Sequence, residues 1–417
     1  MASEEGTGVL VELEVGPVAH GGHCVARHDG RVVFVRHTLP GERVRARLTD
    51  DGPDARFWRA DAVEVLEASP DRVPSVWPEA GPGGVGGGEL AHVALPAQRA
   101  WKEAVLAEQL RHLARLDVTP TVHAAPGDDA RGGLAWRTRI DLVADADGRA
   151  GMRGFRSHDV VALDAMPLAT EHVAALDLLG RRWIPGARIE AVAPADGSPP
   201  LVLVDDVPFD LQRGRPDPRP NARAAVREVV TAADGGTRTY RVAAAGFWQV
   251  HREAPALLVD AVLQGAGDVA GGTVLDLYAG AGLFTLPLAD AVGEAGHVVS
   301  VEGDARAVRD ARRNLHDRPQ VDLHAGDVAR TLAGLVEGAP PVDVVVLDPP
   351  RTGAGRKVVD AVAALRPERV VYVACDPAAL ARDVALLGAH GWTGVEVVGH
   401  DLFPMTHHLE AVAVLTR

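Results

Sequence analysis

The chain has 417 residues, of which 47% are apolar, and a formal net charge of −14. This size and composition predict a globular protein of two or three domains and exclude a disordered or fibrous chain. No apolar run reaches the roughly 18 residues of a membrane span, and the first residues lack the basic and apolar parts of a secretory signal. We therefore expect a cytoplasmic monomer with no membrane partner.

The cysteine content is low, with Cys24 and Cys375 the only two. Two distant cysteines offer no disulfide framework and too few thiolates for a zinc or iron–sulfur site, so we expect no metal. We interpret Cys24, in a short stretch rich in Gly and His, as a small structural residue.

The negative charge argues against a nucleic-acid partner until the charges are located. Residues 1–60 and 131–241 are close to neutral and rich in Arg, whereas the rest of the chain carries the acidic excess. Two separate segments can therefore present basic faces.

Short alternating segments fill the N-terminal region, as in 9–15, 31–36 and 43–47, with turn signals at 28–30 and 39–41. This pattern predicts a small β-barrel. Arg on one strand face, followed by the basic and aromatic segment 55–60, suits an oligonucleotide surface, because Arg meets phosphates and rings stack on bases. The alternative is an ordinary solvated strand face.

The middle of the chain is harder to interpret. Residues 69–96 are rich in Pro and Gly, which is typical of a flexible connector. Apolar residues recur at helical spacing from 98 to 116 and predict one amphipathic helix. Residues 120–240 mix short strands, turns and scattered Arg, as in an α+β domain.

After about residue 255, apolar strands alternate with helices, which predicts an α/β domain with a doubly wound parallel sheet. We expect strands at 273–277, 298–301, 342–347 and 370–373, helices at 286–291, 305–315, 358–365 and 378–387, and a closing strand at 409–416.

A Gly-containing loop follows the first of these strands, with Asp276, Tyr278, Gly280 and Gly282 in order. Its glycines allow a tight turn and close approach of a ligand to the backbone, and Glu302 ends the next strand, where a ribose hydroxyl needs an acceptor. The bulk of Tyr278 and the missing third glycine disfavour a pyrophosphate, and hence a nicotinamide cofactor. S-adenosyl-L-methionine fits better.

Two further strands end in chemically informative residues. The turn Asp348–Arg351 is of the kind that methyltransferases place beside the transferred methyl, but Arg351 stands where amine methyltransferases carry an aromatic residue. Cys375 follows the next strand, so its thiol should lie at the carboxyl end of the sheet. A pyrimidine C5 accepts a methyl group only after a thiolate attacks C6, and Cys375 is the candidate; the alternative is a buried, inert thiol.

Several motifs together resemble the TRAM-domain RNA (uracil-5-)methyltransferases over nearly the whole chain. The matching segments are 31–35, 39–43, 246–250, 275–284, 348–353, 373–377 and 408–410. The resemblance implies a TRAM-like RNA-binding, OB-like β-barrel at 1–68, a central α+β RNA-binding domain at 69–240 and a Rossmann-like catalytic domain at 241–417. Helix 98–116 can pack on the catalytic domain.

The resemblance also implies roles for individual residues. The cofactor set is Gln249, Asp276, Tyr278, Gly280, Gly282, Glu302, Asp327 and Asp348. Cys375 is the nucleophile and Glu410 the base, with Asp348 and Arg351 beside them. The target is a flipped uridine in structured RNA, with 23S ribosomal RNA favoured and transfer RNA as the alternative.

The chain departs from this family at four positions. Many relatives hold an iron–sulfur cluster with four cysteines, and the corresponding residues here are Trp77, Val85, Gly88 and Met166. No cluster can form from these side chains, so we expect apolar packing in its place.

Three other functions stay open. A 5-methylcytosine RNA methyltransferase usually carries a cysteine after the prolines, where Arg351 and Thr352 stand. A small-molecule methyltransferase has no use for a basic barrel. A catalytically silent RNA-binding or folding factor needs no thiol. The adjacent His407 and His408 point to different faces of a strand, which disfavours a metal site.

Overall fold

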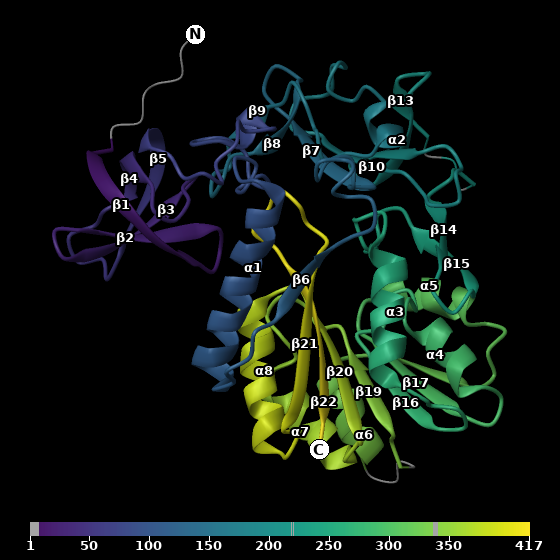
Figure 1. Cartoon of the computed structure of the whole chain (residues 1–417). Helices are drawn as coiled ribbons and strands as arrows, with labels where there is room; N and C mark the ends of the chain where they lie inside the picture. Colours follow the sequence, from purple (N-terminus) through teal and green to yellow (C-terminus); the bar gives the residue numbers. More distant parts are fainter. Residues whose placement is uncertain (1–7, 218, 220, 337–340) are drawn as a thin grey trace.

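The computed structural model describes residues 8–217, 219, 221–336 and 341–417. Figure 1 shows three parts in chain order: a small N-terminal barrel, a central sheet domain and a larger α/β domain that ends the chain. None of the helices in these ranges is both long and apolar enough to cross a membrane.

The first five strands close into a barrel in the order β1-β2-β3-β5-β4. Their bounds are β1 (Leu10–Ala19), β2 (His23–His28), β3 (Arg31–Arg36), β4 (Arg43–Asp50) and β5 (Trp58–Glu67). Alternation along β1 turns Val11 and Leu13 inward and leaves Glu12 exposed. The β2–β3 hairpin turns at Asp29 and Gly30, both with positive φ, which matches the strand twist. The predicted β-barrel is confirmed.

A seven-stranded sheet forms the central part, in the order β13-β12-β11-β10-β7-β8-β9. Its elements are β7 (Arg139–Ala144), β8 (Ala150–Arg153), β9 (Val160–Ala162), β10 (Arg188–Val192), β11 (Leu201–Val204), β12 (Val207–Asp210), β13 (Arg215–Pro216) and the short helices η1 (Pro78–Ala80) and α2 (Glu171–Ala174). One face is buried on a cluster that includes Trp136, Leu142 and Ile189.

The Gly-rich segment before this sheet is compact rather than a free connector. Trp77 and Val85 are buried in the same apolar cluster, and Met166 packs against it. Gly88 lies so close to Trp77 that an added Cβ would sit 2.9 Å from the indole ring. The four positions that the resemblance aligns with cluster cysteines therefore lie in or beside apolar packing, as the sequence predicted.

One buried cation joins the barrel to the central domain. Arg36 donates from Nε and Nη2 to the two carboxylate oxygens of Asp61 at 2.8 and 2.7 Å. Its guanidinium carbon also lies 3.6 Å from the ring centre of Phe155, in the segment after β8. A desolvated cation–π contact of this kind stabilises a structure by about 2 kcal/mol.

The C-terminal domain is a doubly wound sheet, which confirms the predicted fold class. The strand order is β18-β17-β16-β19-β20-β22-β21-β6. The strands are β16 (Thr273–Leu277), β17 (His297–Glu302), β18 (Val321–Ala325), β19 (Val344–Leu347), β20 (Arg369–Ala374), β21 (Gly394–Asp401) and β22 (Glu410–Thr416). The helices are α3 (Ala254–Ala266), α4 (Thr285–Val292), α5 (Ala305–Asn314), α6 (Val328–Val336), α7 (Gly355–Leu365) and α8 (Pro377–Ala389).

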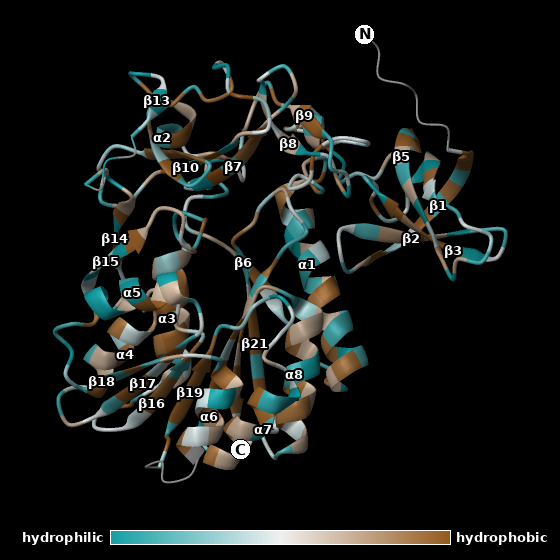
Figure 2. Cartoon of the chain, turned by 180° about the vertical axis from the view of Figure 1, so that it is seen from behind, coloured by the Kyte–Doolittle hydropathy of each residue, from teal (hydrophilic) through white to brown (hydrophobic). Residues whose placement is uncertain are grey.

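Helices cover both faces of this sheet. Buried residues of α3, α4 and α5 form one apolar cluster with the strands, and those of α6, α7 and α8 form a second cluster on the other face. Figure 2 shows the hydrophobic colour concentrated along strands such as β16 and β19, between the helices. Both strand faces are buried, which explains why these strands read as continuous apolar runs.

Two elements from the first half of the chain complete the C-terminal domain. Strand β6 (Thr121–Ala124) pairs in parallel with β21 at the sheet edge. Helix α1 (Leu95–Gln109), followed by a π-helical turn at Leu110–Ala114, buries Leu106 and Leu110 in the same cluster as α8. In Figure 1 this helix runs beside the sheet of the C-terminal domain.

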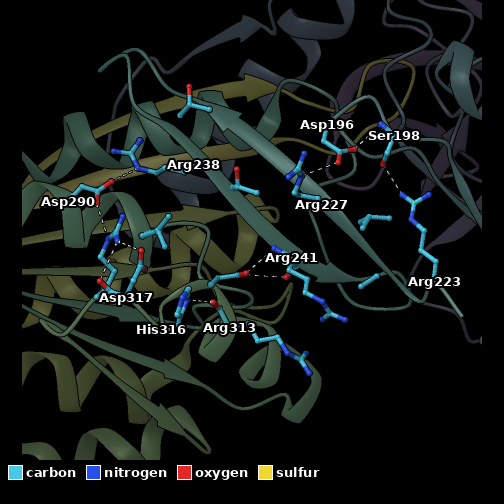
Figure 3. A pocket seen from close by; sticks show the side chains of 17 residues that line it. Asp196, Ser198, Arg223, Arg227, Arg238, Arg241, Asp290, Arg313, His316 and Asp317 are labelled. Atoms are coloured by element: carbon cyan, nitrogen blue, oxygen red, sulfur yellow. Dashed lines mark hydrogen bonds and ion pairs between the residues drawn. The ribbon is translucent and has the colours of Figure 1, made fainter. Parts of the chain in front are cut away.

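An arginine-rich joint connects the β14–β15 hairpin (Ala225–Thr231 and Thr237–Ala243) to α4 and α5 (Figure 3). It borders a cavity of about 800 Å³. Arg238 bonds Asp234 and Asp290, each at 2.8 Å, and Arg241 bonds Asp310 at 3.0 Å. Because carboxylates hold these guanidinium groups, the joint fixes the hairpin on the C-terminal domain.

The tight packing at Gly88 predicts a stability difference between two glycine substitutions. In Gly88→Ala the new Cβ would lie 2.5 Å from that of Ala80, so overpacking should destabilise the protein by about 1–3 kcal/mol. The control Gly334→Ala, in α6, meets no atom within 4 Å and should be neutral or more stable by about 0.5–1 kcal/mol. Urea denaturation followed by tryptophan fluorescence measures both. Equal stability of the two variants would contradict the compact packing of this segment.

Candidate active site

The carboxyl ends of four parallel strands bring predicted site residues to one edge of the sheet. In β16, Leu277 pairs with Val301 of β17 and with Leu347 of β19. Tyr278, Glu302 and Asp348 therefore lie at neighbouring strand ends. This edge is where open α/β sheets bind their ligands.

Strand β22 brings the thiol and a carboxylate together. It runs antiparallel to β20, and Ala411 is the partner of Ala374. Cys375 directly follows β20 and Glu410 begins β22, so both residues lie at the end of this strand pair, where the charge of Glu410 acts on the thiol. Cys375 is half-buried, whereas Glu410 is only 4% exposed.

Burial and neighbouring charges shift the pKa values of both groups. Burial and the neighbouring charge of Glu410 raise the pKa of Cys375 to about 11, while Arg351 acts in the opposite direction. Burial and the charge of Asp348 hold the pKa of Glu410 well above its usual range. The thiol is thus protonated in the free protein at neutral pH, and the ionised form of Glu410 is disfavoured relative to that of an exposed carboxyl group.

Two more carboxyl groups are perturbed at this edge. Burial raises the pKa of Asp276 to about 7, and burial together with the charge of Asp276 raises the pKa of Asp348 to about 7. Asp276 accepts a hydrogen bond from Thr285 at 2.5 Å, but its Oδ1 has no partner among the described residues. Such a cluster of acids favours a ligand that brings positive charge and hydrogen-bond donors.

The loop after β16 is shaped for close approach of a ligand. Tyr278, Gly280 and Gly282 all have positive φ, and an added Cβ on Gly280 would meet nothing within 4 Å. The carboxylate of Glu302 accepts from the backbone N–H of Gly280 at 2.7 Å and of Asp304 at 2.6 Å. These bonds fix Glu302 beside the loop and leave lone pairs free for further donors.

The other two predicted cofactor residues, Asp327 and Gln249, differ in how closely they are connected to the rest of the site. Asp327 follows β18, accepts from the Arg330 N–H at 2.9 Å and acts electrostatically on Tyr278. Gln249 follows β15 and precedes α3 in the chain, and its side chain is buried. No hydrogen bond within the described ranges joins it to the other site residues. Asp327 is therefore close to Tyr278 in the loop after β16, whereas no such relation to this loop is found for Gln249 among the described residues.

A buried network that sequence analysis missed holds the turn after Asp348. Tyr372 donates to Asp383 at 2.5 Å, and the Ala354 N–H donates to the same carboxylate at 2.7 Å. Gly353 has a φ of 85°, and a Cβ there would lie 2.7 Å from Asp383. Gly353 was the signal in the sequence that could have revealed this network, because the turn needs a positive φ and leaves no room for a side chain.

His407 and His408 lie in the loop before β22 rather than on a strand, and their ring centres are 4.1 Å apart, so the prediction that they point to different faces of a strand is wrong. His408 Nε2 lies 3.5 Å from Arg351 Nη2, and burial lowers the pKa of His408 to about 3. Among the described residues, no group of three His, Cys, Asp or Glu side chains could hold a metal ion.

Cys24 has the structural environment predicted for it. It is fully buried in the barrel, its thiol donates to the Thr38 carbonyl at 3.7 Å, and burial raises its pKa to about 12. A thiol in this environment is unreactive.

Comparison with known families matches two regions of the chain. A TRAM domain matches residues 5–63, and the family described as conserved hypothetical protein 95 matches residues 260–388. These regions coincide with most of the barrel and with much of the doubly wound domain.

Full-length relatives are also similar. An uncharacterized RNA methyltransferase of Streptomyces coelicolor is 45% identical over 97% of this chain and 92% of its own length. Another, from Bifidobacterium longum, is 44% identical over 100% of this chain and 99% of its own length.

One solved structure shares the whole arrangement. The tRNA (uracil-54, C5)-methyltransferase of Pyrococcus abyssi, in complex with S-adenosyl-L-homocysteine, superposes with a TM-score of 0.68 at 21% identity. The match covers 97% of this chain and 100% of that chain, so the two proteins share their fold.

The charges around Cys375 predict how its reactivity depends on pH. Alkylation by iodoacetamide should rise with pH to about 11, well above the range of an ordinary thiol. Glu410→Gln should lower the apparent pKa because it removes a negative neighbour, and Arg351→Gln should raise it because it removes a positive one. Mass spectrometry of the labelled peptide reports Cys375 alone. Shifts of the same sign in both variants would contradict this electrostatic arrangement.

Proposed function

Because this chain belongs to the family of RNA methyltransferases, we propose that it transfers a methyl group from S-adenosyl-L-methionine to carbon 5 of a uridine in structured RNA. The observation that supports this choice is that one half-buried thiol, Cys375 directly after β20, lies near one buried carboxyl group, Glu410 at the start of β22, whose charge acts on the thiol. Methylation of a pyrimidine carbon needs a nucleophile and a base, and amine methylation needs no thiol.

The reaction begins with attack of the Cys375 thiolate on C6 of the uracil. Electrons of the C5–C6 bond move toward C5 and the O4 oxygen, and Arg351, the cation that lowers the pKa of Cys375, stabilises the negative charge. C5 then forms a bond to the methyl carbon, and the bond between that carbon and the donor's sulfur breaks with both electrons going to the sulfur, which becomes neutral.

Glu410 completes the reaction by removing the proton from C5. The electron pair of the C5–H bond re-forms the C5–C6 double bond, and the C6–S bond breaks to release Cys375. A carboxylate whose pKa is raised by burial is a stronger base than an exposed one.

The residues of the acidic sheet edge fit the methyl donor. We assign Asp348 and Asp276 to its positively charged end, Glu302 to the ribose hydroxyls, and Tyr278 and Asp327 to the adenosine side, with Gln249 as a further contact. S-adenosyl-L-methionine supplies the methyl group and a sulfonium charge when bound. A positive charge beside Cys375 would also lower the pKa of the thiol, which ties nucleophile activation to donor binding.

The target base must leave its stack before C6 can meet the thiol. Flipping a base costs a few kcal/mol, which contacts from the barrel and central domain would offset. The near-neutral composition of residues 1–60 and 131–241 in a chain of net charge −14 is consistent with RNA contacts there.

We propose 23S ribosomal RNA as the substrate, with transfer RNA as the second candidate because the Pyrococcus abyssi protein is a tRNA (uracil-54, C5)-methyltransferase. A catalytically silent RNA-binding factor is the alternative from another class, and it predicts no dependence on Cys375.

RNA containing 5-fluorouridine tests the proposed chemistry. Fluorine at C5 cannot leave as a cation, so the reaction should stop at a covalent adduct that resists denaturation. We expect an RNA–protein band on a denaturing gel, with the RNA attached to Cys375. Cys375→Ala should abolish both the band and methylation of normal RNA.

Cys24→Ala is the matched control and should keep both activities, because Cys24 lies inside the barrel. An adduct on Cys24, or full methylation by Cys375→Ala, would refute the thiol mechanism.

A further inference from the structure

The loop between β21 and β22, residues 402–409, leads directly into Glu410 and is unusually well fixed. Met405, in its middle, is 3% exposed and has a φ of +69°, a conformation that non-glycine residues rarely adopt. Such a conformation persists only where the surrounding contacts impose it. The contacts come from α1, which lies about 300 residues earlier in the chain.

Gln98 of α1 binds the middle of this loop. Its side-chain oxygen accepts from the Met405 N–H at 2.8 Å, and its side-chain nitrogen donates to the carbonyls of Val93 at 2.8 Å and Leu90 at 3.2 Å. Gln98 is fully buried, and both ends of its amide are used. Removing it would leave a buried backbone N–H and two carbonyls without this partner.

Lys102, one turn further along α1, binds the start of the same loop. Its ammonium group donates to Asp401 at 2.5 Å and to the Phe403 carbonyl at 3.0 Å. Both charged side chains are almost completely buried. Burying an ion pair so deeply costs desolvation free energy unless good geometry and further hydrogen bonds compensate for it. A displaced loop would lose these contacts, so the pair holds the loop in one position.

The end of the Gly-rich segment also contacts this loop. The Leu90 N–H donates to the Met405 carbonyl at 2.9 Å, and Glu89 lies 3.4 Å from His407 Nδ1. The segment that lacks the cysteines of other family members thus still contacts the loop before Glu410.

We propose that Gln98 and Lys102 are positioning residues that set Glu410 against Cys375, so that α1 is part of the catalytic machinery without touching the substrate. This inference rests on the proposed function, because Glu410 must be the base for its position to matter. Displacement of the loop should impair the step that removes the C5 proton and leave attack by Cys375 unaffected. A displacement of about 1 Å can slow a step on the order of 100-fold.

The test uses the full-length enzyme, unmodified uridine RNA and S-adenosyl-L-methionine carrying a labelled methyl group. In Gln98→Ala we expect methyl transfer and adduct formation at close to the wild-type rate. Release should be roughly 10- to 100-fold slower, so the methylated adduct accumulates on denaturing gels. Glu410→Gln should show the same accumulation more strongly. Gln109→Ala, at the far end of α1, is the matched control and should behave as wild type.

Asp401→Asn is the second variant, in case Gln98→Ala does not fold. It keeps the shape of the side chain but removes the charge that holds Lys102, and it should slow release in the same direction with a smaller effect. Thermal melting and donor binding report whether each variant is folded.

Two results would overturn the inference: release at the wild-type rate in folded Gln98→Ala and Asp401→Asn, or equal slowing of adduct formation and release. The first means that the contacts do not position Glu410, and the second means that they serve general stability. Failure of the proposed function looks different, because then neither the wild type nor Glu410→Gln forms a methylated adduct with uridine RNA.

Discussion

The antiparallel pairing of β22 with β20 is the constraint on which the site depends. In a sheet of parallel strands, the carboxyl ends share one edge, and residues that begin a strand lie at the other. The reversed strand β22 begins at the edge where β20 ends, and the register of Ala374 with Ala411 places Glu410 and Cys375 at the same end of this strand pair. The proposed nucleophile and the proposed base thus lie at one end of a strand pair although 35 positions separate them in sequence.

The raised pKa values at the site have one cause, which is that several carboxyl groups are buried close together at this edge of the sheet. Asp276, Asp348 and Glu410 each have a raised pKa, first because they are buried and second because a neighbouring carboxylate disfavours ionisation. Such an arrangement costs stability in the free protein. It favours a cationic donor, and it keeps the Cys375 thiol protonated until a positive charge arrives. Under the proposed function, donor binding would relieve this repulsion before the thiol attacks C6.

Sequence reasoning identified the strand ends because their signal is local: apolar runs that stop at Asp348 and Cys375. The partnership of Glu410 with Cys375 came only from resemblance, because antiparallel register is set by tertiary packing. The roles of Gln98 and Lys102 were missed for the same reason. A weak signal existed, since both polar residues lie one turn apart on the face of α1 that also buries Trp101 and Val105. Edge strand β6 left no such trace, because four residues are too few for a pattern.

Release of the C5 hydrogen tests the central claim most directly. RNA labelled with tritium at C5 of uridine would be incubated with the enzyme and S-adenosyl-L-methionine carrying a labelled methyl group. The account predicts one tritium released to water for each methyl transferred, with both signals lost in Cys375→Ala. Methyl transfer to RNA without tritium release would contradict it, because the methyl group would then sit on an atom other than C5.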